Sequence, residues 1–376
     1  MVSESTPASA DLERIRGEID RIDRQLQELL NRRAECAQQV AEVKKAELSG
    51  AGPQPDGSGA AFYRPEREAQ VLRRVMQRNS GPLPAAEVAH IFREIMSACL
   101  ALEKPMTIAF LGPEGTFTQA AAIKHFGHAV QSRPLATIGA VFDAVESGEA
   151  DYGVVPVENS TEGMVTHTLD SFIKSSLKIC GEVELPIRLH LLGAPDCRVE
   201  KLRRICAHQQ ALAQSRNWLE KNWPDIEQQP TSSNGEAARL AAADVSVAAV
   251  AGDMACDTYG LVRLASNIQD YAANTTRFLV VGREQVRPSG SDKTSIIVST
   301  RNKPGALFRL LEPFQREQLM LTRIDTRPSR SETWTYLFFM EFEGHQEDPK
   351  VAAVLRELEE QTVMMKILGS YPQAVI

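Results

Sequence analysis

The chain has 376 residues, which at roughly 150 residues per domain predicts two or three domains. It carries 42 Lys and Arg against 49 Asp and Glu, and this formal net charge of −7 argues against a general nucleic-acid-binding protein, which needs a basic face. The hydrophobic fraction of 43% and charged fraction of 24% are typical of globular proteins, and no apolar run approaches the roughly 20 residues of a membrane helix. No secretory signal is visible and the six cysteines form no C-x-x-C pair, so we expect a cytoplasmic protein that acts on small molecules.

Residues 1–104 are predicted to form an all-helical domain. Between 11 and 47, apolar residues recur at steps of three and four, which is the spacing of one buried helical face. A helix of that length is about 55 Å long and needs a partner to cover its apolar face, so we expect a homodimer, with higher oligomers left open. A Gly-, Pro- and Ser-rich loop follows at 49–59, and two shorter helices are expected at 65–78 and 85–103.

Residues 105–285 alternate short apolar strands with helices, which predicts an α/β domain of two lobes with a cleft between them. Strands are expected at 107–111, 152–157, 204–207, 245–250 and 276–281, with helices at 117–126, 138–146, 208–222 and 234–243.

After a linker at 283–291, residues 292–376 are predicted to form a third domain. Its elements follow the order βαββαβ of a ferredoxin-like α+β fold. They are expected at 293–300, 305–317, 319–327, 334–343, 347–361 and 364–371.

Basic side chains of the helical domain are spaced to form cationic pockets. Arg33 and Lys44 lie about three turns apart on nearly one helix face, whereas Arg16 lies roughly 100° away from that face. Arg16 would therefore serve a different pocket, which in a dimer is the partner's. Any one of these arginines, taken alone, is more often part of the solvated face of a coiled-coil dimer.

The helical segment resembles the all-helical chorismate mutases. The resemblance rests on the pattern Ile15-Arg16…Asp20-x-x-Asp23…Leu29-Leu30-x-x-Arg33…Val40-x-x-x-Lys44…Tyr63-Arg64-Pro65-Glu66-Arg67-Glu68. It implies a bundle, shared between two subunits, that rearranges chorismate to prephenate in a pericyclic step. Such a site works by holding the substrate in a reactive conformation and by stabilising the negative charge that builds on the breaking ether bond.

The resemblance also implies roles for individual side chains. Substrate carboxylates are expected to be bound by Arg16 from the partner, Arg33 and Arg67, the ether oxygen by Lys44, and the substrate hydroxyl by Glu68. Cys99 and Glu103 share one face of the third helix and occupy two further site positions. If Glu103 faces the ether oxygen, it must be protonated to donate a hydrogen bond, which favours mildly acidic pH.

Three polar stretches of the α/β segment lie next to expected strand ends, where ligands bind in open α/β sheets. Residues 112–118 form a Gly-rich turn that could hold an anion at a helix N-terminus, although Thr116 could equally be a plain helix cap. The second stretch is Val155–Gly163 and the third is Thr275–Phe278. Neither a G-x-G-x-x-G nor a P-loop motif is present, so nucleotide binding is unsupported.

Together these stretches resemble the prephenate dehydratases through Gly-Pro-x-Gly-Thr-Phe-Thr, Pro-x-Glu-Asn-Ser-x-x-Gly and Thr-Arg-Phe, in that order. The resemblance implies a two-lobed, periplasmic-binding-protein-like fold that converts prephenate to phenylpyruvate with loss of carbon dioxide and water. Thr276 is expected to assist the departing hydroxide, polarised by Arg277, with Glu158 as a rival acid if burial raises its pKa. The expected substrate-binding residues are Thr116, Asn159, Ser160, Thr161, Arg277 and Phe278. His208 is interpreted as structural rather than as a general base.

The third domain resembles the amino-acid-binding ACT domains of phenylalanine-inhibited dehydratases. The matching residues are Gly305, Ala306 and Leu307 at the start of its first helix and Asp325, Thr326, Arg327 and Pro328 at the end of its second strand. The resemblance implies L-phenylalanine as an allosteric ligand at an interface between subunits.

The chain is thus interpreted as resembling the bifunctional chorismate mutase–prephenate dehydratases with a C-terminal ACT domain. No metal or organic cofactor is implied, because neither reaction is a redox step. Two alternatives stay open: a dehydratase whose mutase helices survive only as a dimerisation arm, and a two-lobed amino-acid-sensing protein without enzymatic activity.

Overall fold

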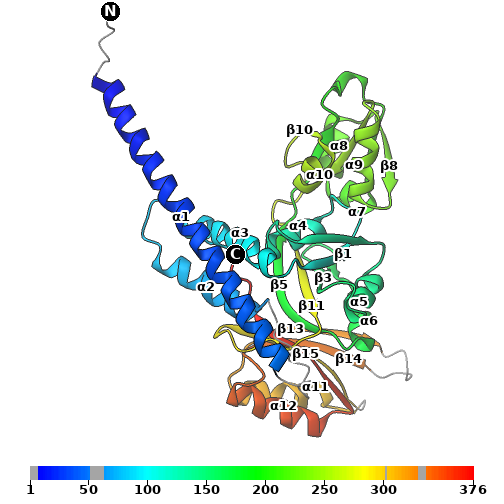
Figure 1. The fold of residues 1–376 in the computed structure, drawn as a ribbon. Helices are drawn as coiled ribbons and strands as arrows, with labels where there is room; N and C mark the ends of the chain where they lie inside the picture. Colours follow the sequence, from blue (N-terminus) through cyan, green and yellow to red (C-terminus); the bar gives the residue numbers. More distant parts are fainter. Residues whose placement is uncertain (1–6, 51–62, 301–302, 329–335) are drawn as a thin grey trace, which may run out of the picture.

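The computed structural model describes residues 7–50, 63–300, 303–328 and 336–376. Three units are visible: a helical arm, a two-lobed α/β body and a small α/β unit beneath the body (Figure 1). No helix in these ranges is long and apolar enough to cross a bilayer.

The helical arm consists of α1 (Pro7–Gly50), α2 (Pro65–Arg78) and α3 (Ala85–Glu103). Both α1 and α2 contact α3, while the N-terminal half of α1 projects away from the rest of the chain (Figure 1). The apolar stripe of α1 is exposed in the single chain, with 62% of Leu29 and 51% of Ile19 accessible to solvent. The three predicted helices are confirmed, and the long one presents the uncovered apolar face that its periodicity indicated.

The first lobe is built on a sheet of strand order β2-β1-β3-β11-β5, with the short β4 paired to β3. Strands β1, β2 and β3 run parallel, whereas β11 is antiparallel to both of its neighbours. The strands are β1 (Thr107–Leu111), β2 (Gln131–Leu135), β3 (Tyr152–Asn159), β4 (Gly163–Met164), β5 (Lys178–Pro186) and β11 (Thr275–Gly282), and the helices are α4 (Phe117–Phe126), α5 (Ile138–Glu146) and α6 (Thr166–Lys174).

The second lobe holds a sheet of order β10-β6-β9-β7-β8. Its strands are β6 (His190–Gly193), β7 (Arg204–His208), β8 (Glu227–Thr231), β9 (Val247–Ala251) and β10 (Val262–Ala265), and its helices are η1 (Val199–Lys201), α7 (Gln209–Gln214), α8 (Arg216–Asn222), α9 (Asn234–Ala243) and α10 (Asp253–Tyr259). The prediction of a single helix over 208–222 is wrong. The helix is broken at Ser215, whose ψ of 14° lies outside the helical region.

Two crossovers connect the lobes, one between β5 and β6 and one between β10 and β11. The crossovers lie side by side, since the amide of Ile187 donates to Asn274 O at 2.8 Å and the amide of Ile268 donates to Leu189 O at 2.8 Å. This double connection is a hinge between two lobes, and the two-lobed prediction is confirmed.

The C-terminal unit has the predicted βαββαβ order, with a sheet of order β13-β14-β12-β15. Its elements are β12 (Asp292–Ser299), α11 (Ala306–Arg316), β13 (Leu321–Pro328), β14 (Tyr336–Glu343), α12 (Pro349–Gln361) and β15 (Met364–Pro372). Helices α11 and α12 cover one sheet face (Figure 1), and the other face shares a hydrophobic core with the first lobe. The contact is close: a Cβ at Gly369 would lie 2.4 Å from Ile179 O on β5, so this position requires glycine.

Candidate active sites

Thr276 and Asn159 are direct partners in the pairing of β11 with β3, and Arg277 is the partner of Glu158. Side chains alternate between the two faces of a strand, so the two pairs face opposite ways. The Thr276–Asn159 pair lies among polar side chains at the hinge, whereas the Arg277–Glu158 pair faces the C-terminal unit. This register places Asn159 and Thr276 on the opposite sheet face from their sequence neighbours Glu158 and Arg277.

The amide orientation of Asn159 follows from its hydrogen bonds. Its Oδ1 accepts from the backbone N–H of Thr161 at 3.0 Å and of Glu162 at 3.2 Å, and backbone amides can only donate. The Nδ2 must therefore be the atom that faces Thr276, and it donates to Thr276 Oγ1 at 2.7 Å. Because Asn159 supplies the hydrogen bond that this hydroxyl accepts, the Thr276 proton can be donated to a group in the cleft.

A closed ring of hydrogen bonds joins this pair to the second lobe. Asn159 Nδ2 also donates to Asn274 Oδ1 at 3.0 Å, and Asn274 Nδ2 donates to Gln214 Oε1 at 3.0 Å. Gln214 Nε2 then donates to Thr161 Oγ1 at 3.1 Å, and Thr161 Oγ1 donates back to Asn159 Oδ1 at 2.6 Å. Gln214 ends α7, so the ring links the two lobes across the hinge.

Four predicted site residues are brought together here: Asn159, Ser160, Thr161 and Thr276. Ser160 Oγ accepts from the Thr275 amide at 3.0 Å, next to the ring. Sequence analysis did not assign roles to Asn274 and Gln214, although Asn274 lies only two residues before Thr276. Gln214 lies in a segment for which the sequence predicted only a helix, so no motif marked it.

Thr116 is placed as a helix cap. Its Oγ1 accepts from the Gln119 amide at 3.4 Å and donates to Leu111 O at 3.2 Å. The preceding loop packs against the second lobe, because Tyr259 Oη donates to Glu114 O at 3.1 Å. His208 likewise caps α7 by accepting from the Gln210 amide, which agrees with its structural interpretation. The structure thus favours the capping alternative for Thr116.

Arg277 does not lie beside the Thr276 hydroxyl, which corrects the expectation that it polarises that group. Its guanidinium is buried and donates to Glu341 of β14 at 2.9 and 2.6 Å and to Glu182 of β5 at 3.1 Å. Phe278 was expected to bind substrate. Its side chain instead lies in the hydrophobic core of the first lobe, where it is 2% exposed.

Glu158 forms an ion pair with Arg323 of β13. An ion pair favours the carboxylate over the acid, and the side chain faces away from Thr276. The structure therefore gives no support to Glu158 as the rival proton donor.

The predicted mutase residues occupy α1, α2 and α3. Arg33 and Lys44 are half-buried on α1, while Arg16 is exposed on its projecting half and Arg67 is exposed at the start of α2. On α3, Cys99 is 7% exposed and Glu103 is half-buried. The single chain does not bring Arg16 together with Arg33, as expected if Arg16 serves a partner's pocket.

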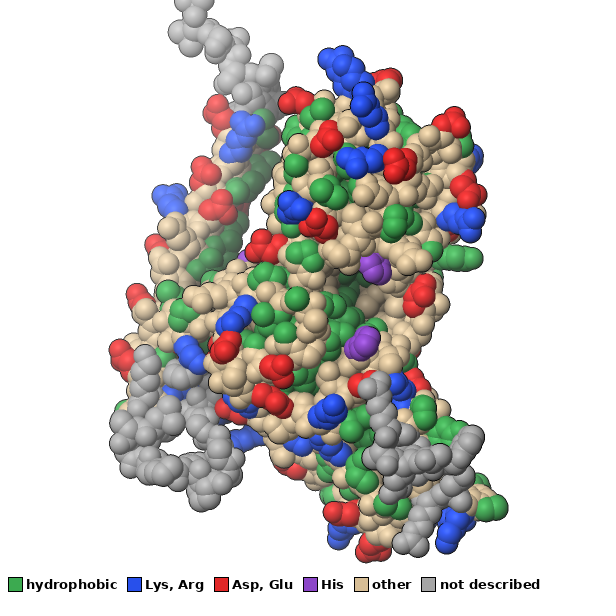
Figure 2. Space-filling model, turned by 90° about the vertical axis from the view of Figure 1, so that its right-hand side faces the viewer, with side chains coloured by type: hydrophobic (Ala, Val, Ile, Leu, Met, Phe, Trp, Pro, Cys, Tyr) green, Lys and Arg blue, Asp and Glu red, His purple; other side chains and the backbone are tan. Residues whose placement is uncertain are grey.

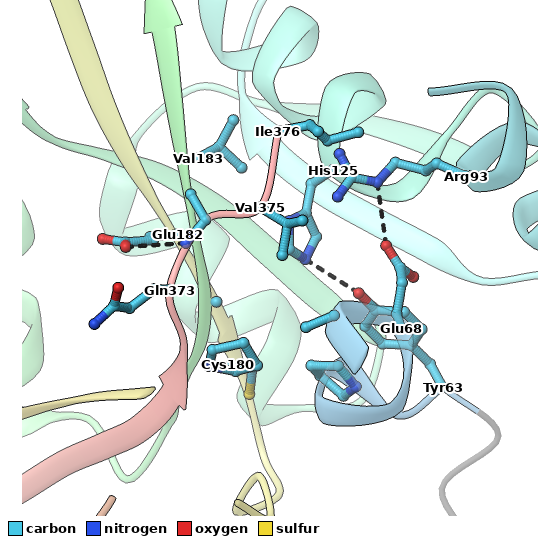
Figure 3. A pocket seen from close by; sticks show the side chains of 15 residues that line it. Tyr63, Glu68, Arg93, His125, Cys180, Glu182, Val183, Gln373, Val375 and Ile376 are labelled. Carbon is cyan, nitrogen blue, oxygen red and sulfur yellow. Dashed lines mark hydrogen bonds and ion pairs between the residues drawn. The ribbon is translucent and has the colours of Figure 1, made fainter. Parts of the chain in front are cut away.

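Glu68 is placed differently from its expected role at the substrate hydroxyl. It lies on the face of α2 that packs against the first lobe and accepts from Arg93 Nε at 3.2 Å (Figure 3). Burial raises the pKa of Glu68, against the opposing effect of Arg93. Nearby, Tyr63 Oη and His125 Nε2 are hydrogen bonded at 3.1 Å, and burial, reinforced by Arg93, lowers the pKa of His125 to about 3.

The two predicted phenylalanine-binding stretches lie at the start of α11 and the end of β13. Gly305 has a φ of +78° and caps α11, and Leu307 is 41% exposed. Arg327 forms an ion pair with Asp170 on α6 at 3.1 Å. The second stretch therefore contacts the first lobe directly.

One face of the body is hollowed between the lobes, with hydrophobic side chains in the hollow and a histidine on either side (Figure 2). A separate cavity of about 990 Å³ lies between α5, α6 and the C-terminal unit, and Pro328 lines it. Among the residues that the structure describes, no three His, Cys, Asp or Glu side chains gather in an arrangement that could hold a metal ion.

The chain thus combines a two-lobed α/β domain that has a polar ring at its hinge with a helical arm and a βαββαβ unit. Family models match in the same order: chorismate mutase type II over residues 15–104, prephenate dehydratase over 108–286 and the ACT domain over 294–360. The chain belongs to the family of bifunctional chorismate mutase/prephenate dehydratases.

Relatives described as bifunctional chorismate mutase/prephenate dehydratase match nearly the full chain. Those of Stutzerimonas stutzeri and Pseudomonas aeruginosa are 52% and 53% identical over 365 residues, covering 97% of this chain and 98% of each relative. The bifunctional interpretation is confirmed: this is an enzyme with a mutase domain, a dehydratase domain and an ACT domain.

Two solved structures are similar over the dehydratase and ACT domains. The prephenate dehydratase of Arthrobacter aurescens in complex with L-Phe is 34% identical with a TM-score of 0.65, covering 71% of this chain and 89% of that one. A structure described as GqqA, a novel type of quorum quenching acylase, is 28% identical with a TM-score of 0.66, covering 72% of this chain and 98% of that one.

Proposed function

We propose that the hinge ring performs the dehydratase step on prephenate, with Thr276 as the hydrogen-bond donor to the departing hydroxyl. The bond to the ring carboxylate breaks, its electron pair enters the ring, and the ring expels hydroxide. Aromatisation provides the driving force, but hydroxide is a poor leaving group and needs a donor as charge develops on it. The observation that carries this proposal is the 2.7 Å hydrogen bond from Asn159 to Thr276, because it leaves the Thr276 proton for the substrate.

The remaining ring members support this proposal by their chemistry. Prephenate is a dianion, and the chain has a net charge of −7. Binding therefore requires local hydrogen-bond donors rather than overall electrostatic attraction. Ser160 and Thr161 supply hydroxyls beside Asn159, and Gln214 joins from the other lobe. Closure of the lobes would complete this set of donors around the substrate and exclude water.

The mutase step is proposed to use Arg33, Lys44 and Arg67 with Arg16 from a second subunit. The exposed apolar stripe of α1 supports a homodimer, since a solvated stripe of that length is covered by packing against a second copy. Cys99 and Glu103 on α3 would complete the pocket. The product of this step is the substrate of the hinge ring, and we place both in the cytoplasm.

The ACT domain is proposed to bind L-phenylalanine, the amino acid formed from phenylpyruvate by transamination, through residues 305–307 and 325–328. The phenylalanine complex of the similar dehydratase from Arthrobacter aurescens supports this ligand. Binding there regulates the dehydratase only if it favours one conformation of the lobes over another.

The proposal is tested by supplying chorismate and, in parallel, prephenate, and by following chorismate loss, prephenate binding and phenylpyruvate formation with and without phenylalanine. We expect chorismate loss and phenylpyruvate formation in the wild type, no chorismate turnover in Arg33→Ala, and inhibition by phenylalanine. Turnover of prephenate without turnover of chorismate would instead leave a dehydratase with a dimerisation arm. Tight prephenate binding without any product would leave a binding protein.

A further inference from the structure

Arg323 of the ACT domain holds the hairpin that carries Asn159. Its guanidinium pairs with Glu158 and donates to the sulfur of Met164 at 3.5 Å. Glu158 and Met164 are direct partners in the pairing of β3 with β4. One side chain from the ACT domain therefore contacts both arms of the hairpin at its base, and the turn from Asn159 to Glu162 forms its tip.

The position of Arg323 matters because Glu158 and Asn159 are consecutive residues on opposite faces of β3. Successive residues of a strand are only about 3.3 Å apart, so a displacement of Glu158 displaces Asn159 with it. The Asn159–Thr276 hydrogen bond is 2.7 Å long, and such bonds weaken steeply with distance and angle. Movement of β13 relative to the first lobe is thereby converted into a change at Thr276.

The same strand also contacts the chain after the hairpin. Arg327, on the same face of β13, donates to Thr166 O at 3.3 Å and pairs with Asp170 at 3.1 Å on α6. The ACT domain thus contacts the segment 158–170 on both sides of the catalytic turn. Strand β13 is also the strand that carries the proposed phenylalanine-binding residues, so a ligand there acts directly on these contacts.

We propose that Arg323 is a positioning residue that couples the ACT domain to the dehydratase site, by holding Glu158 and so setting Asn159 against Thr276. This inference rests on the proposed function, since it requires dehydratase turnover at the hinge ring and phenylalanine binding at the ACT domain. Coupling between two sites needs a contact whose energy differs between two states, and the Arg323–Glu158 pair is such a contact across the domain boundary.

The pair is suited to mutagenesis because about a quarter of each side chain is exposed, 26% for Arg323 and 28% for Glu158. Neither side chain is fully buried, so water can reach the group left behind by a substitution, and we expect the chain to stay folded. The chain also provides two controls. Mutase turnover reports folding of the same protein, and Arg316, which pairs with Glu357 on α12, is an ACT arginine outside this contact.

The experiment uses full-length Arg323→Gln, Arg323→Lys, the charge-swapped Glu158→Arg/Arg323→Glu and the control Arg316→Gln. For each, dehydratase kcat and KM, phenylalanine binding by calorimetry, dehydratase inhibition at saturating phenylalanine, and mutase kcat are measured. We expect Arg323→Gln to reduce the fold-inhibition at saturating phenylalanine by about tenfold or more, within the range of allosteric couplings, while phenylalanine binding and mutase kcat stay within about twofold. Arg323→Lys and the swapped variant should recover most of the inhibition.

Unchanged inhibition of Arg323→Gln, in an assay where the wild type is inhibited, overturns the proposal. So does loss of phenylalanine binding in that variant, since Arg323 would then belong to the ligand site. If dehydratase kcat falls at constant KM and the swapped variant restores kcat, the result supports a positioning role for Arg323. If the swapped variant does not restore kcat, the result overturns that role. A wild type that neither binds phenylalanine nor is inhibited by it refutes the proposed regulation instead, and a wild type without prephenate turnover refutes the proposed function.

Discussion

The Asn159 amide donates to the Thr276 hydroxyl across two paired strands, and its own oxygen is held by the backbone amides of Thr161 and Glu162. The contacts of the Asn159 oxygen fix the direction of its hydrogen bond to Thr276. Because the oxygen faces the two backbone N–H groups, the NH₂ group must face the opposite side, toward Thr276. The direction of the Asn159–Thr276 hydrogen bond therefore follows from a turn in the backbone rather than from a neighbouring charge.

Replacing Asn159 by Asp tests this directional requirement. The variant keeps an oxygen for the two backbone amides but replaces the NH₂ group with a second oxygen, toward which Thr276 would donate its proton. We expect dehydratase kcat to fall by about 10²–10³-fold, the loss typical of a misplaced donor, with mutase kcat unchanged. Steady-state kinetics on chorismate and on prephenate check this, and dehydratase turnover equal to the wild type would contradict it.

Removing the Gln214 side chain tests the link between lobes. Gln214→Ala deletes one donor and one acceptor of the ring, and leaves Asn274 Nδ2 and Thr161 Oγ1 without these partners. We expect KM for prephenate to rise and kcat to fall, because the ring loses the side chain that joins the second lobe to Asn274 and Thr161. Gln210→Ala, an earlier residue of α7 whose own side chain is not in the ring, should behave as the wild type.

Replacing Arg277 tests whether the face of β11 that carries Arg277 is structural, while the opposite face carries the proposed catalytic Thr276. Arg277→Met leaves the buried Glu341 without its closest cation and leaves Glu182 with Lys293 alone, and breaking a buried pair in this way costs about 3–5 kcal/mol. We expect the free energy of urea unfolding to fall by that order. Full stability together with loss of turnover would show that Arg277 acts on the substrate after all.

The same ion pair predicts an acid-dependent stability. Burial raises the pKa of Glu341, but hydrogen bonds and charge from Arg277 outweigh it and lower the pKa from 4.5 to about 2. A carboxyl with a lower pKa in the folded state stabilises the fold above its unfolded pKa, and this contribution is lost as the pH falls toward the folded value. The stability difference between wild type and Glu341→Gln should therefore shrink between about pH 4.5 and 2 and be constant above pH 5.

Mixing two inactive mutases tests the shared pocket. Arg16→Ala and Arg33→Ala should each abolish mutase turnover, because every pocket of either homodimer lacks one arginine. In a mixed dimer one pocket contains both arginines, so refolding the two variants together should restore about a quarter of the wild-type mutase activity. Continued absence of turnover in verified mixed dimers would place Arg16 and Arg33 in one pocket of the same chain.

Local patterns were sufficient where short-range physics decides the structure. The apolar period of α1, the βαββαβ order of the ACT domain and the strand-end motifs around Asn159 and Thr276 were all predicted correctly from sequence. Each depends on periodicity or on the order of elements, which neighbouring residues encode. The break of the helix at Ser215 was missed because no Gly or Pro marks it. It coincides with contacts from Asp270, far along the chain, whose carboxylate accepts from the amides of Asn217 and Trp218 at the start of α8.

Arg277, Glu158 and Glu68 show what sequence proximity does not specify. Each is adjacent to a predicted site residue. Arg277 and Glu158 pair with the ACT residues Glu341 and Arg323, whereas Glu68 pairs with Arg93 of α3. Adjacent residues of a strand face opposite sides, and adjacent residues of a helix diverge by about 100°. Proximity in sequence therefore suggested that neighbouring residues belong to one site, whereas the fold places their side chains in two separate environments.

The sequence by itself determined the family, the order of the three domains and the polar stretches around Asn159 and Thr276, because motifs and periodicity are local properties of the chain. Only the tertiary structure decided which face each side chain occupies and which partner it meets. The ring through Asn159, Asn274 and Gln214, and the contact of Arg323 with Glu158, join residues far apart in sequence. Such contacts exist only after strand register and domain packing are set, so no local pattern encodes them.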